Sequence, residues 1–339
     1  MGAQLDPGLL TPVHSVPRID LSFMSFLPPD NPREKTNIRW IEKIEHETDN
    51  RVRITPRYER NVFEAANSAD ALAPVVWQGW RQVFDRADIS IITALVPGTP
   101  LPISRALKYF VYGADLLGVR EIHRALWQEF PELRNEYSSL IVLGCHPEPE
   151  FLVLSKRPVP TLDAFEGLKL TGIMGEFADL IGKLGAVFTP LDNPRTLAAS
   201  DVDGLIFIKE ALMEFGISET TLYGTRLHTC NPPLDTYVMS PEVWNQLPSD
   251  IQKAFDDNRP GLEAALDAVV LDIDRKSHDY AITQGHQFLE LSREDRNRLF
   301  DLMRVVALRE AGELDAQGLP GTKIFRETRR LVEEWVRPR

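Results

Sequence analysis

Three observations predict an α/β protein that is organised around more than one domain. Strand-like apolar runs alternate with helix-like segments through most of the chain, which is typical of sheets built from parallel crossovers. A helical tract from about Ser249 to Gln284 would be about 50 Å long at roughly 1.5 Å per residue. Such a helix is too long for one small domain and long enough to run along two. The length of 339 residues also suits two ordinary domains.

Prolines and apolar residues mark the elements of the N-terminal half. Residues 1–18 contain three prolines and no periodicity, which indicates a loose arm. Ile19–Phe26 is expected to be a strand, and the LPPDNP that follows ends it. Pro32 stands where a helix can begin, and isoleucines then recur every three residues. The further expected elements are strands at 51–58, 87–96 and Ser138–Cys145, a helix at 68–85 that breaks near Pro74, and helices at 106–113 and 119–130.

The C-terminal half begins with a short strand and a βαβ unit. The sequence GLKLTG at 167–172 predicts a strand that ends at a turn, where a parallel sheet would meet a ligand. A helix and a second strand follow it. The further expected elements are strands at 151–155, 201–208, 236–240 and 285–292, a loop at 230–235, the long helix, a helix after the last strand, and a final helix from about Thr322 to Val336.

Composition narrows the classes of partner. Hydrophobic residues make up 43% of the chain and charged residues 26%, and the formal net charge is −12, which argues against nucleic acid and anionic membranes as partners. No window reaches the roughly 18 apolar residues of a membrane span. The N-terminus lacks a basic region followed by an apolar one, so either the protein stays in the cytoplasm or a leader has been removed. The sequence has only two cysteines, Cys145 and Cys230, which excludes a framework of several disulfides but allows one bridge between them.

Catalytic motifs do not emerge from the sequence. It contains no GxSxG, GxGxxG, P-loop or HExxH pattern. The richest polar cluster is CHPEPE at 145–150, which can be interpreted as a metal site, as an acid–base pair, or as a crossover between two sheets whose prolines break the strand. Extended residues alternate faces, so His146, Glu148 and Glu150 would share a side and Cys145 would point away. The crossover is the favoured interpretation, because a second ligand group is not visible.

Trp77 and Trp80 lie three residues apart on an expected helix. They could stack on a ligand, but such pairs are more often part of a packing seam. His46, His123 and His278 fall in expected helices among charged neighbours, where solvation is the simplest interpretation.

Several segments, taken in order, resemble the extracytoplasmic solute-binding proteins of tripartite ATP-independent periplasmic (TRAP) transporters. The similarity extends over residues 19–300 approximately and includes both the loop after the first strand and the βαβ unit. The matching pieces are FLPPDNP at 26–32, SKRP at 155–158, LDAFEGLK at 162–169, LGAVFTP at 184–190, VDG at 202–204 and PEVWNQLPSDIQKA at 241–254.

The resemblance implies a two-lobed periplasmic-binding-protein fold of type II-like character, with a long spine helix and a hinge cleft that closes on a solute. Closure of this kind is a population shift driven by contacts made only in the shut state. A receptor needs no catalytic groups, and no cofactor or metal is expected. The implied division is an arm at 1–18, a first lobe at 19–143 plus 232–280, a second lobe at 144–231 plus 281–315, and a helical extension at 316–339.

Three positions depart from the family pattern. The strand after Gly-Leu-Lys usually ends in an arginine that binds a carboxylate, and here it ends in Thr171. Phe207 stands where relatives often have asparagine, and Glu150 lies near a position that is often basic. A neutral, partly apolar or aromatic solute is therefore expected, or a cationic solute met by Glu148 or Glu150. The alternative is an acid held by a relocated arginine, such as Arg105 or Arg226.

The expected role is a periplasmic receptor that passes a small organic solute to membrane permease subunits. One alternative is an enzyme on the same clamp that uses His146 with Glu148 or Glu150, and Cys145 as nucleophile; another is a sensor that reports the ligand to a partner. The residues expected to line the cleft are Ser25, Phe26, Thr93, Glu150, Thr171, Ile173, Phe207 and Asn231.

Overall fold

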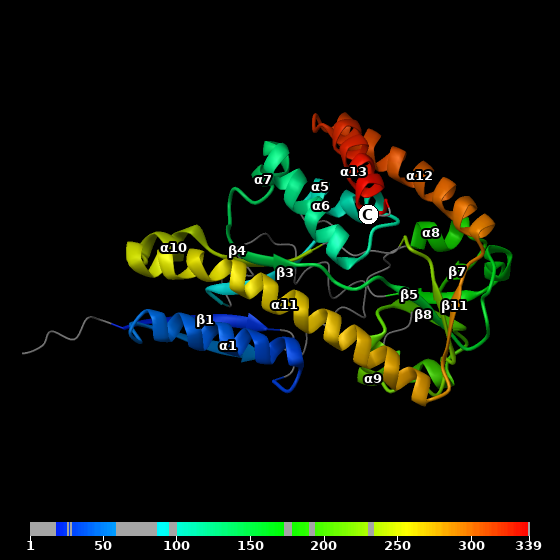
Figure 1. Cartoon of the computed structure of the whole chain (residues 1–339), viewed down its shortest axis with the longest axis horizontal. Coiled ribbons are helices and arrows are strands. Elements are labelled where there is room, and N and C mark those ends of the chain that lie inside the picture. The colour runs from blue at the N-terminus through cyan, green and yellow to red at the C-terminus, as the bar shows by residue number, and fades with distance from the viewer. Residues whose placement is uncertain are drawn as a thin grey trace, which may run out of the picture.

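The computed structural model describes residues 18–25, 27, 29–58, 87–94, 100–172, 178–189, 194–229 and 234–337. Within these ranges the chain forms two β-sheets, and a long helix runs past both of them (Figure 1). Predicted elements that fall between the ranges, including the helix at 68–85 with Trp77 and Trp80, lie outside the described residues.

The first sheet has five strands. β1 pairs with β2 and β3 in parallel, whereas β10 runs antiparallel to both β3 and β4. In spatial order the strands are β2 (Val52–Tyr58), β1 (Ile19–Ser25), β3 (Ile89–Thr93), β10 (Asp235–Met239) and β4 (Ile141–His146).

The second sheet has six strands. β6 is parallel to β7 and β8, β11 is parallel to β9, and β5 is antiparallel to β8 and β9. In spatial order the strands are β11 (Gln287–Glu290), β9 (Tyr223–Arg226), β5 (Leu152–Ser155), β8 (Gly204–Phe207), β6 (Lys169–Gly172) and β7 (Val187–Phe188). β5 and β10 therefore depart from the parallel crossovers that the sequence predicts. Each is the first strand after the chain has passed from the other sheet, and each enters its own sheet in the opposite direction.

Helix α11 (Ser249–Thr283) confirms the long helix that the sequence predicts. Its first half contacts α1 and β4, and its second half contacts α9 beside the second sheet (Figure 1). Pro260 lies inside this helix. The spine therefore joins two lobes, each built around one sheet.

The remaining helices cover the two sheets. The final helix and the helix that begins at Pro32 are confirmed, whereas α9 and β9 were not anticipated because residues 209–229 carry no clear periodic pattern. Besides α11, the described helices are α1 (Pro32–Glu47), α5 (Pro102–Phe110), α6 (Leu116–Glu129), α7 (Pro131–Asn135), α8 (Ala178–Lys183), α9 (Glu210–Glu214), α10 (Pro241–Gln246), α12 (Arg293–Ala316) and α13 (Gly321–Trp335), with 3-10 turns at Leu162–Phe165 and Pro194–Ala199.

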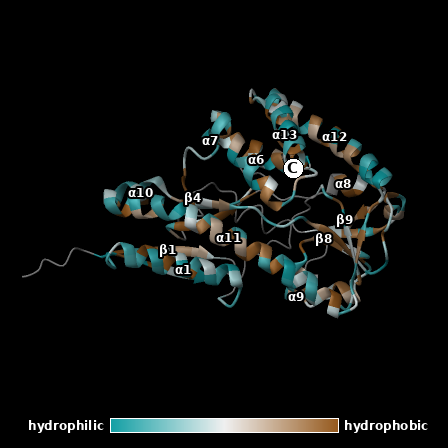
Figure 2. Cartoon of the chain, viewed as in Figure 1, coloured by the Kyte–Doolittle hydropathy of each residue, from teal (hydrophilic) through white to brown (hydrophobic). Residues whose placement is uncertain are grey.

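Two large hydrophobic cores stabilise the molecule. In the first lobe, Trp40 lies with its ring 6.4 Å from Phe23, 6.2 Å from Tyr237 and 6.0 Å from Phe255. The larger core joins α5 and α6 to α12, α13 and strands of the second sheet. Figure 2 shows apolar residues gathered along strands such as β8 and hydrophilic residues on helices such as α10. The exact lobe boundaries stay a prediction.

Close contact with the neighbouring strand explains why the VDG segment requires a glycine at position 204. Gly204 pairs with Ser155 across β5 and β8, and a Cβ there would lie 2.4 Å from the Leu154 carbonyl oxygen and 2.9 Å from Ser155 Cα. We expect Gly204→Ala to lower the free energy of unfolding by about 1–3 kcal/mol, the usual cost of overpacking. Urea denaturation measures this change.

Gly261 is the matched control for Gly204. It lies inside α11, and a Cβ there would meet nothing within 4 Å. Gly261→Ala should therefore raise stability by about 0.5–1 kcal/mol, the helix preference of alanine over glycine. Equal effects of the two substitutions would contradict the steric explanation.

Candidate functional site

The candidate site lies where the chain passes between the lobes. Residues 147–151 connect β4 to β5, and residues 227–234 connect β9 to β10. Ligands of open α/β sheets bind beyond the carboxyl ends of parallel strands. In the first lobe these ends are Ser25 of β1 and Thr93 of β3, and in the second lobe they are Gly172 of β6 and Phe207 of β8.

A buried polar network supports the first-lobe side of the site. The Ser25 hydroxyl donates to Glu34 Oε2 at 2.6 Å, and Asn37 Nδ2 donates to the same oxygen at 2.9 Å. The Tyr237 hydroxyl in turn donates to Asn37 Oδ1 at 2.7 Å. Ser25, Glu34 and Asn37 are fully buried. Ser25 is therefore engaged in holding α1 on β1, and its role toward a solute stays a prediction.

Arg33, in the first turn of α1, joins the two lobes. Its Nη1 lies 2.6 Å from Glu148 Oε1 in the crossover, and its Nη2 lies 2.7 Å from Glu210 Oε2 on α9. The three side chains are only 9%, 10% and 12% exposed. Asn31, the N-cap of α1, adds a bond from its Nδ2 to Glu210 Oε1 at 3.2 Å. Two buried carboxylates thus share one guanidinium at the junction.

Thr93, Asp235 and His146 form a row across three neighbouring strands. The sheet register pairs Asp235 of β10 with Thr93 on one side and with His146 on the other. Asp235 and His146 are 7% and 3% exposed. Together with Arg33, Glu148 and Glu210 they form what we call the junction cluster: Arg33, His146, Glu148, Glu210 and Asp235.

Burial and neighbouring charges shift the pKa values of this cluster. Burial alone would lower the pKa of Arg33, but the carboxylates of Glu148 and Glu210 outweigh it and raise the pKa. Burial raises the pKa of Asp235 well above its ordinary value, and the negative charge of Glu148 raises it further. Burial and the charge of Arg33 lower the pKa of His146 to about 3. Arg33 is therefore charged and His146 neutral at physiological pH.

Thr171 and Phe207 lie at the same end of neighbouring strands. Thr171 of β6 pairs with Leu205 of β8, and Gly172 pairs with Ile206, next to Phe207. Thr171 is only 4% exposed. The Phe207 ring lies 5.3 Å from Phe151 and 5.8 Å from Phe215. Among the described residues at this end of the two strands, Thr171 and Phe207 therefore contribute a hydroxyl and an aromatic ring, and neither carries a charge.

Glu150 and Arg226 neutralise each other. Arg226 Nε donates to Glu150 Oε2 at 2.8 Å, and their side chains are 44% and 11% exposed. Glu150, which was expected to bind a cationic solute, and Arg226, which was considered as an anchor for a carboxylate, therefore form an ion pair with each other. Arg105, the other relocated arginine considered, is on α5 near Glu136; burial raises the pKa of Glu136 to about 7, and the charge of Arg105 opposes part of this rise. Their roles toward a solute stay predictions.

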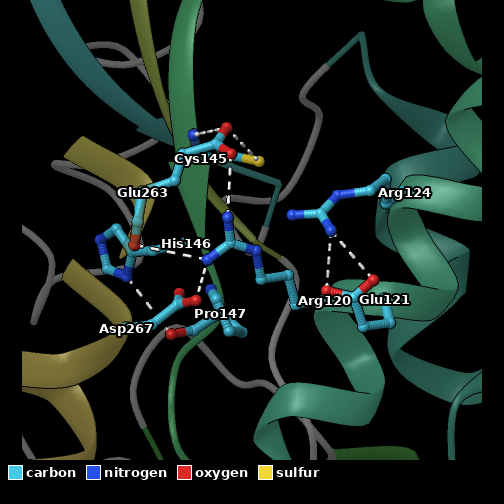
Figure 3. Close-up of polar contacts among 8 residues, drawn as sticks. All are labelled: Arg120, Glu121, Arg124, Cys145, His146, Pro147, Glu263 and Asp267. Carbon is cyan, nitrogen blue, oxygen red and sulfur yellow. Dashed lines mark hydrogen bonds and ion pairs between the residues drawn. The ribbon is translucent and has the colours of Figure 1, made fainter. Parts of the chain in front are cut away.

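Cys145 belongs to a separate polar cluster, shown in Figure 3. Its thiol lies 3.7 Å from Glu263 Oε1 on α11, and Arg120 of α6 pairs with Glu263 at 2.9 Å and also with Asp267. Burial and the charge of Glu263 raise the pKa of the Cys145 thiol to about 12. A thiol that stays protonated is a poor nucleophile, so burial and the nearby carboxylate disfavour Cys145 in that role.

Phe26, Ile173, Asn231 and Cys230 lie outside the described residues. Three residues of the junction cluster were missed by sequence reasoning: Arg33, Glu210 and Asp235. One signal was present for Arg33, because it directly follows the FLPPDNP segment on which the family resemblance rests. Asp235 stood in an expected loop, and Glu210 in a region without a predicted element.

Comparison with known proteins gives structural but not sequence matches. No protein-family model matches the chain, and no curated protein matches it. A TRAP periplasmic solute-binding protein from Desulfovibrio salexigens, crystallised as an open complex, shares 20% identity, with 94% of this chain and 97% of that chain covered and a TM-score of 0.74.

Two further solved structures have the same architecture. A TRAP solute-binding protein from a marine metagenome, specific for aromatic acid ligands, was solved with metahydroxyphenylacetate; it shares 18% identity, with 94% and 100% of the two chains covered and a TM-score of 0.75. A TRAP periplasmic solute-binding protein from Chromohalobacter salexigens, with bound D-glucuronate, shares 16% identity, with 92% and 99% covered and a TM-score of 0.74.

The similarity covers nearly the whole chain and confirms the two-lobed α/β fold expected from the sequence. Among the helices that the structure describes, none is both long and apolar enough to cross a bilayer. All three of these structural relatives are TRAP solute-binding proteins. The chain has the fold of the TRAP periplasmic solute-binding proteins.

Proposed function

We propose that this protein is the periplasmic receptor of a TRAP-type transporter, which captures a small organic solute between its lobes and delivers it to membrane permease subunits. The observation that carries the proposal is the fold, shared over more than nine-tenths of the chain with TRAP solute-binding proteins. The crossovers at the junction and the spine helix α11 are the elements on which such lobes turn.

The solute is neutral and partly apolar or aromatic, or else cationic. Thr171 and Phe207 give the second-lobe edge no positive charge. Arg33 and Arg226 pair with Glu148 and Glu150 of the β4–β5 crossover and therefore already have carboxylate partners, at 2.6–2.8 Å. An acid that bound Arg33 or Arg226 would have to displace one of those carboxylates, and a buried carboxylate without a cation costs several kcal/mol. A neutral solute carries no such penalty, and a cationic one would have to compete with Arg33 or Arg226 for Glu148 or Glu150.

Thermal-shift screening of the full chain against pooled metabolites tests the solute class. A ligand that binds only the folded state stabilises it by about 2.7 kcal/mol at a concentration of 100 Kd. We expect amines, neutral aromatic compounds or polyols to raise the melting temperature. If only carboxylic acids do so, the solute class is wrong; if Arg226→Gln then abolishes their effect, Arg226 is the relocated anchor.

Restoring the family's residues should change specificity. We expect the double variant Thr171→Arg with Phe207→Asn to bind simple carboxylates at least about tenfold more tightly than the parent chain does. This change in affinity corresponds to about 1.4 kcal/mol of binding free energy. The physical reason is a guanidinium at the end of β6 with an amide one strand away. Isothermal titration with benzoate and glucuronate as probes measures the change.

The control for this variant is Thr171→Met with Phe207→Asn. It removes the same aromatic ring from the Phe151–Phe207–Phe215 packing, and at position 171 it adds a longer side chain that carries no charge. A gain of acid binding by both variants, or by neither, would mean that the pocket lies elsewhere.

A further inference from the structure

Within the junction cluster, three side chains of ligand type converge on one point. His146, Glu148 and Asp235 each offer one ligand atom, and these atoms all lie within 4.8 Å of one another. His146 Nδ1 is 3.8 Å from Glu148 Oε1. We propose that His146, Glu148 and Asp235 form a binding site for a divalent transition-metal cation such as Zn²⁺ or Mn²⁺.

Glu148 and Asp235 are each held by a second group, as ligands of metal sites usually are. Arg33 orients Glu148 through the 2.6 Å bond to Oε1. The Thr93 hydroxyl donates to the Asp235 carboxylate. The three groups are therefore fixed by the strands β3, β10 and β4 and by α1, not by mobile surface positions.

The charge of the cluster favours a divalent cation. Ionised Glu148 and Glu210 share the single positive charge of Arg33, which leaves one negative charge in a buried region, and a bound cation would allow Asp235 to ionise as well. Other described cations nearby are engaged: Lys209 pairs with Asp274 at 2.7 Å, and Arg120 pairs with Glu263 and Asp267. Buried charges without partners are costly, and one divalent ion removes the excess.

The mixed ligand set selects the class of metal. Imidazole nitrogen suits Zn²⁺ and other first-row transition metals, whereas Ca²⁺ and Mg²⁺ prefer sites made of oxygen alone. The sequence placed His146 beside Glu148 and Glu150 but showed no second group of ligands, and in the structure Glu150 pairs with Arg226. The structure supplies it as Asp235, which is distant in the sequence and adjacent in the sheet.

Metal binding to the full chain, stripped of metal by chelation and without solute, tests the site. We expect one equivalent of Zn²⁺ or Mn²⁺ by equilibrium dialysis with elemental analysis, and weaker binding of Ca²⁺ and Mg²⁺. Asp235→Asn and His146→Phe should each weaken Zn²⁺ binding by more than about 100-fold, and Thr93→Val, at a positioning residue, by about 10-fold to 100-fold. Glu263→Gln, which removes a carboxylate from the Cys145 cluster instead, should leave the affinity unchanged.

The absorption spectrum of the Co²⁺-loaded parent chain reports the ligand set without any substitution. We expect weak visible bands from nitrogen and oxygen ligands and no strong near-ultraviolet band from a thiolate. The site is refuted by a thiolate band, by a preference for Ca²⁺ or Mg²⁺, by affinity that survives Asp235→Asn, or by the absence of stoichiometric binding. None of these results depends on the identity of the solute or on the transport role.

Discussion

Replacing Arg33 with methionine is expected to lower the free energy of unfolding by about 3–5 kcal/mol, the usual cost of leaving buried carboxylates without their cation. The guanidinium contacts Glu148 at 2.6 Å and Glu210 at 2.7 Å, and all three side chains are at most 12% exposed. Methionine keeps most of the side-chain volume, so the loss measures charge more than packing. Urea denaturation at neutral pH gives the value.

Arg275 provides the control for Arg33. It also pairs with two carboxylates, Asp272 at 2.6 Å and Asp279 at 3.4 Å, but its side chain is 63% exposed. Because exposed pairs contribute about 0–1 kcal/mol, Arg275→Met should change stability by no more than that. Adding Glu148→Gln and Glu210→Gln to Arg33→Met should recover part of the loss. Equal costs for Arg33→Met and Arg275→Met would show that water reaches the junction.

Local patterns predicted most of the elements. Pro32 marks the first residue of α1, with Asn31 as its cap, and the long amphipathic tract became α11 with its expected end within one residue of Thr283. These features depend on neighbours within a few turns, so one sequence contains the information. The antiparallel direction of β5 and β10 depends on how the chain crosses between sheets, which local patterns do not encode.

The site was harder to predict because its contacts join distant residues. Glu150 and Arg226 were each considered as an anchor for a solute of opposite charge, yet they bind each other across 76 positions. Arg33 and Glu210 are 177 positions apart. By contrast, Thr171 and Phe207 could be paired through the family resemblance, and β6 and β8 indeed bring them to one edge. Composition indicated an acidic protein but not which carboxylates are buried.

Acidification is expected to destabilise the protein through two histidines outside the junction. Burial lowers the pKa of His123 to about 4, and burial together with His278 lowers the pKa of His286 to about 4. His123 packs on Trp127, with ring centroids 5.9 Å apart, and His286 is 3% exposed beside Phe288. The expectation of solvated helical histidines therefore fails for His123, which is partly buried.

The direction of the effect follows from proton binding. In the unfolded chain histidine has a pKa of about 6.5, so between pH 6.5 and about 4 the unfolded state binds more protons than the folded state. The contribution of each histidine to stability is complete above pH 6.5 and is lost as the pH falls through this window, with a slope of up to about 1.4 kcal/mol per pH unit. Glu136, whose pKa burial raises to about 7, gives a slope of opposite sign, so the parent profile alone does not isolate the histidines.

Comparison of variants isolates them. His123→Phe and His286→Leu should each reduce the slope of unfolding free energy against pH between 4 and 6.5 by up to about 1.4 kcal/mol per unit. Urea denaturation at a series of pH values measures it. A packing defect caused by the substitution lowers the unfolding free energy at every pH. Its size is measured at pH 8, where both imidazoles are neutral in the folded and in the unfolded state. A variant profile parallel to that of the parent would mean that the folded chain protonates these rings as readily as the unfolded chain does, and that water reaches them.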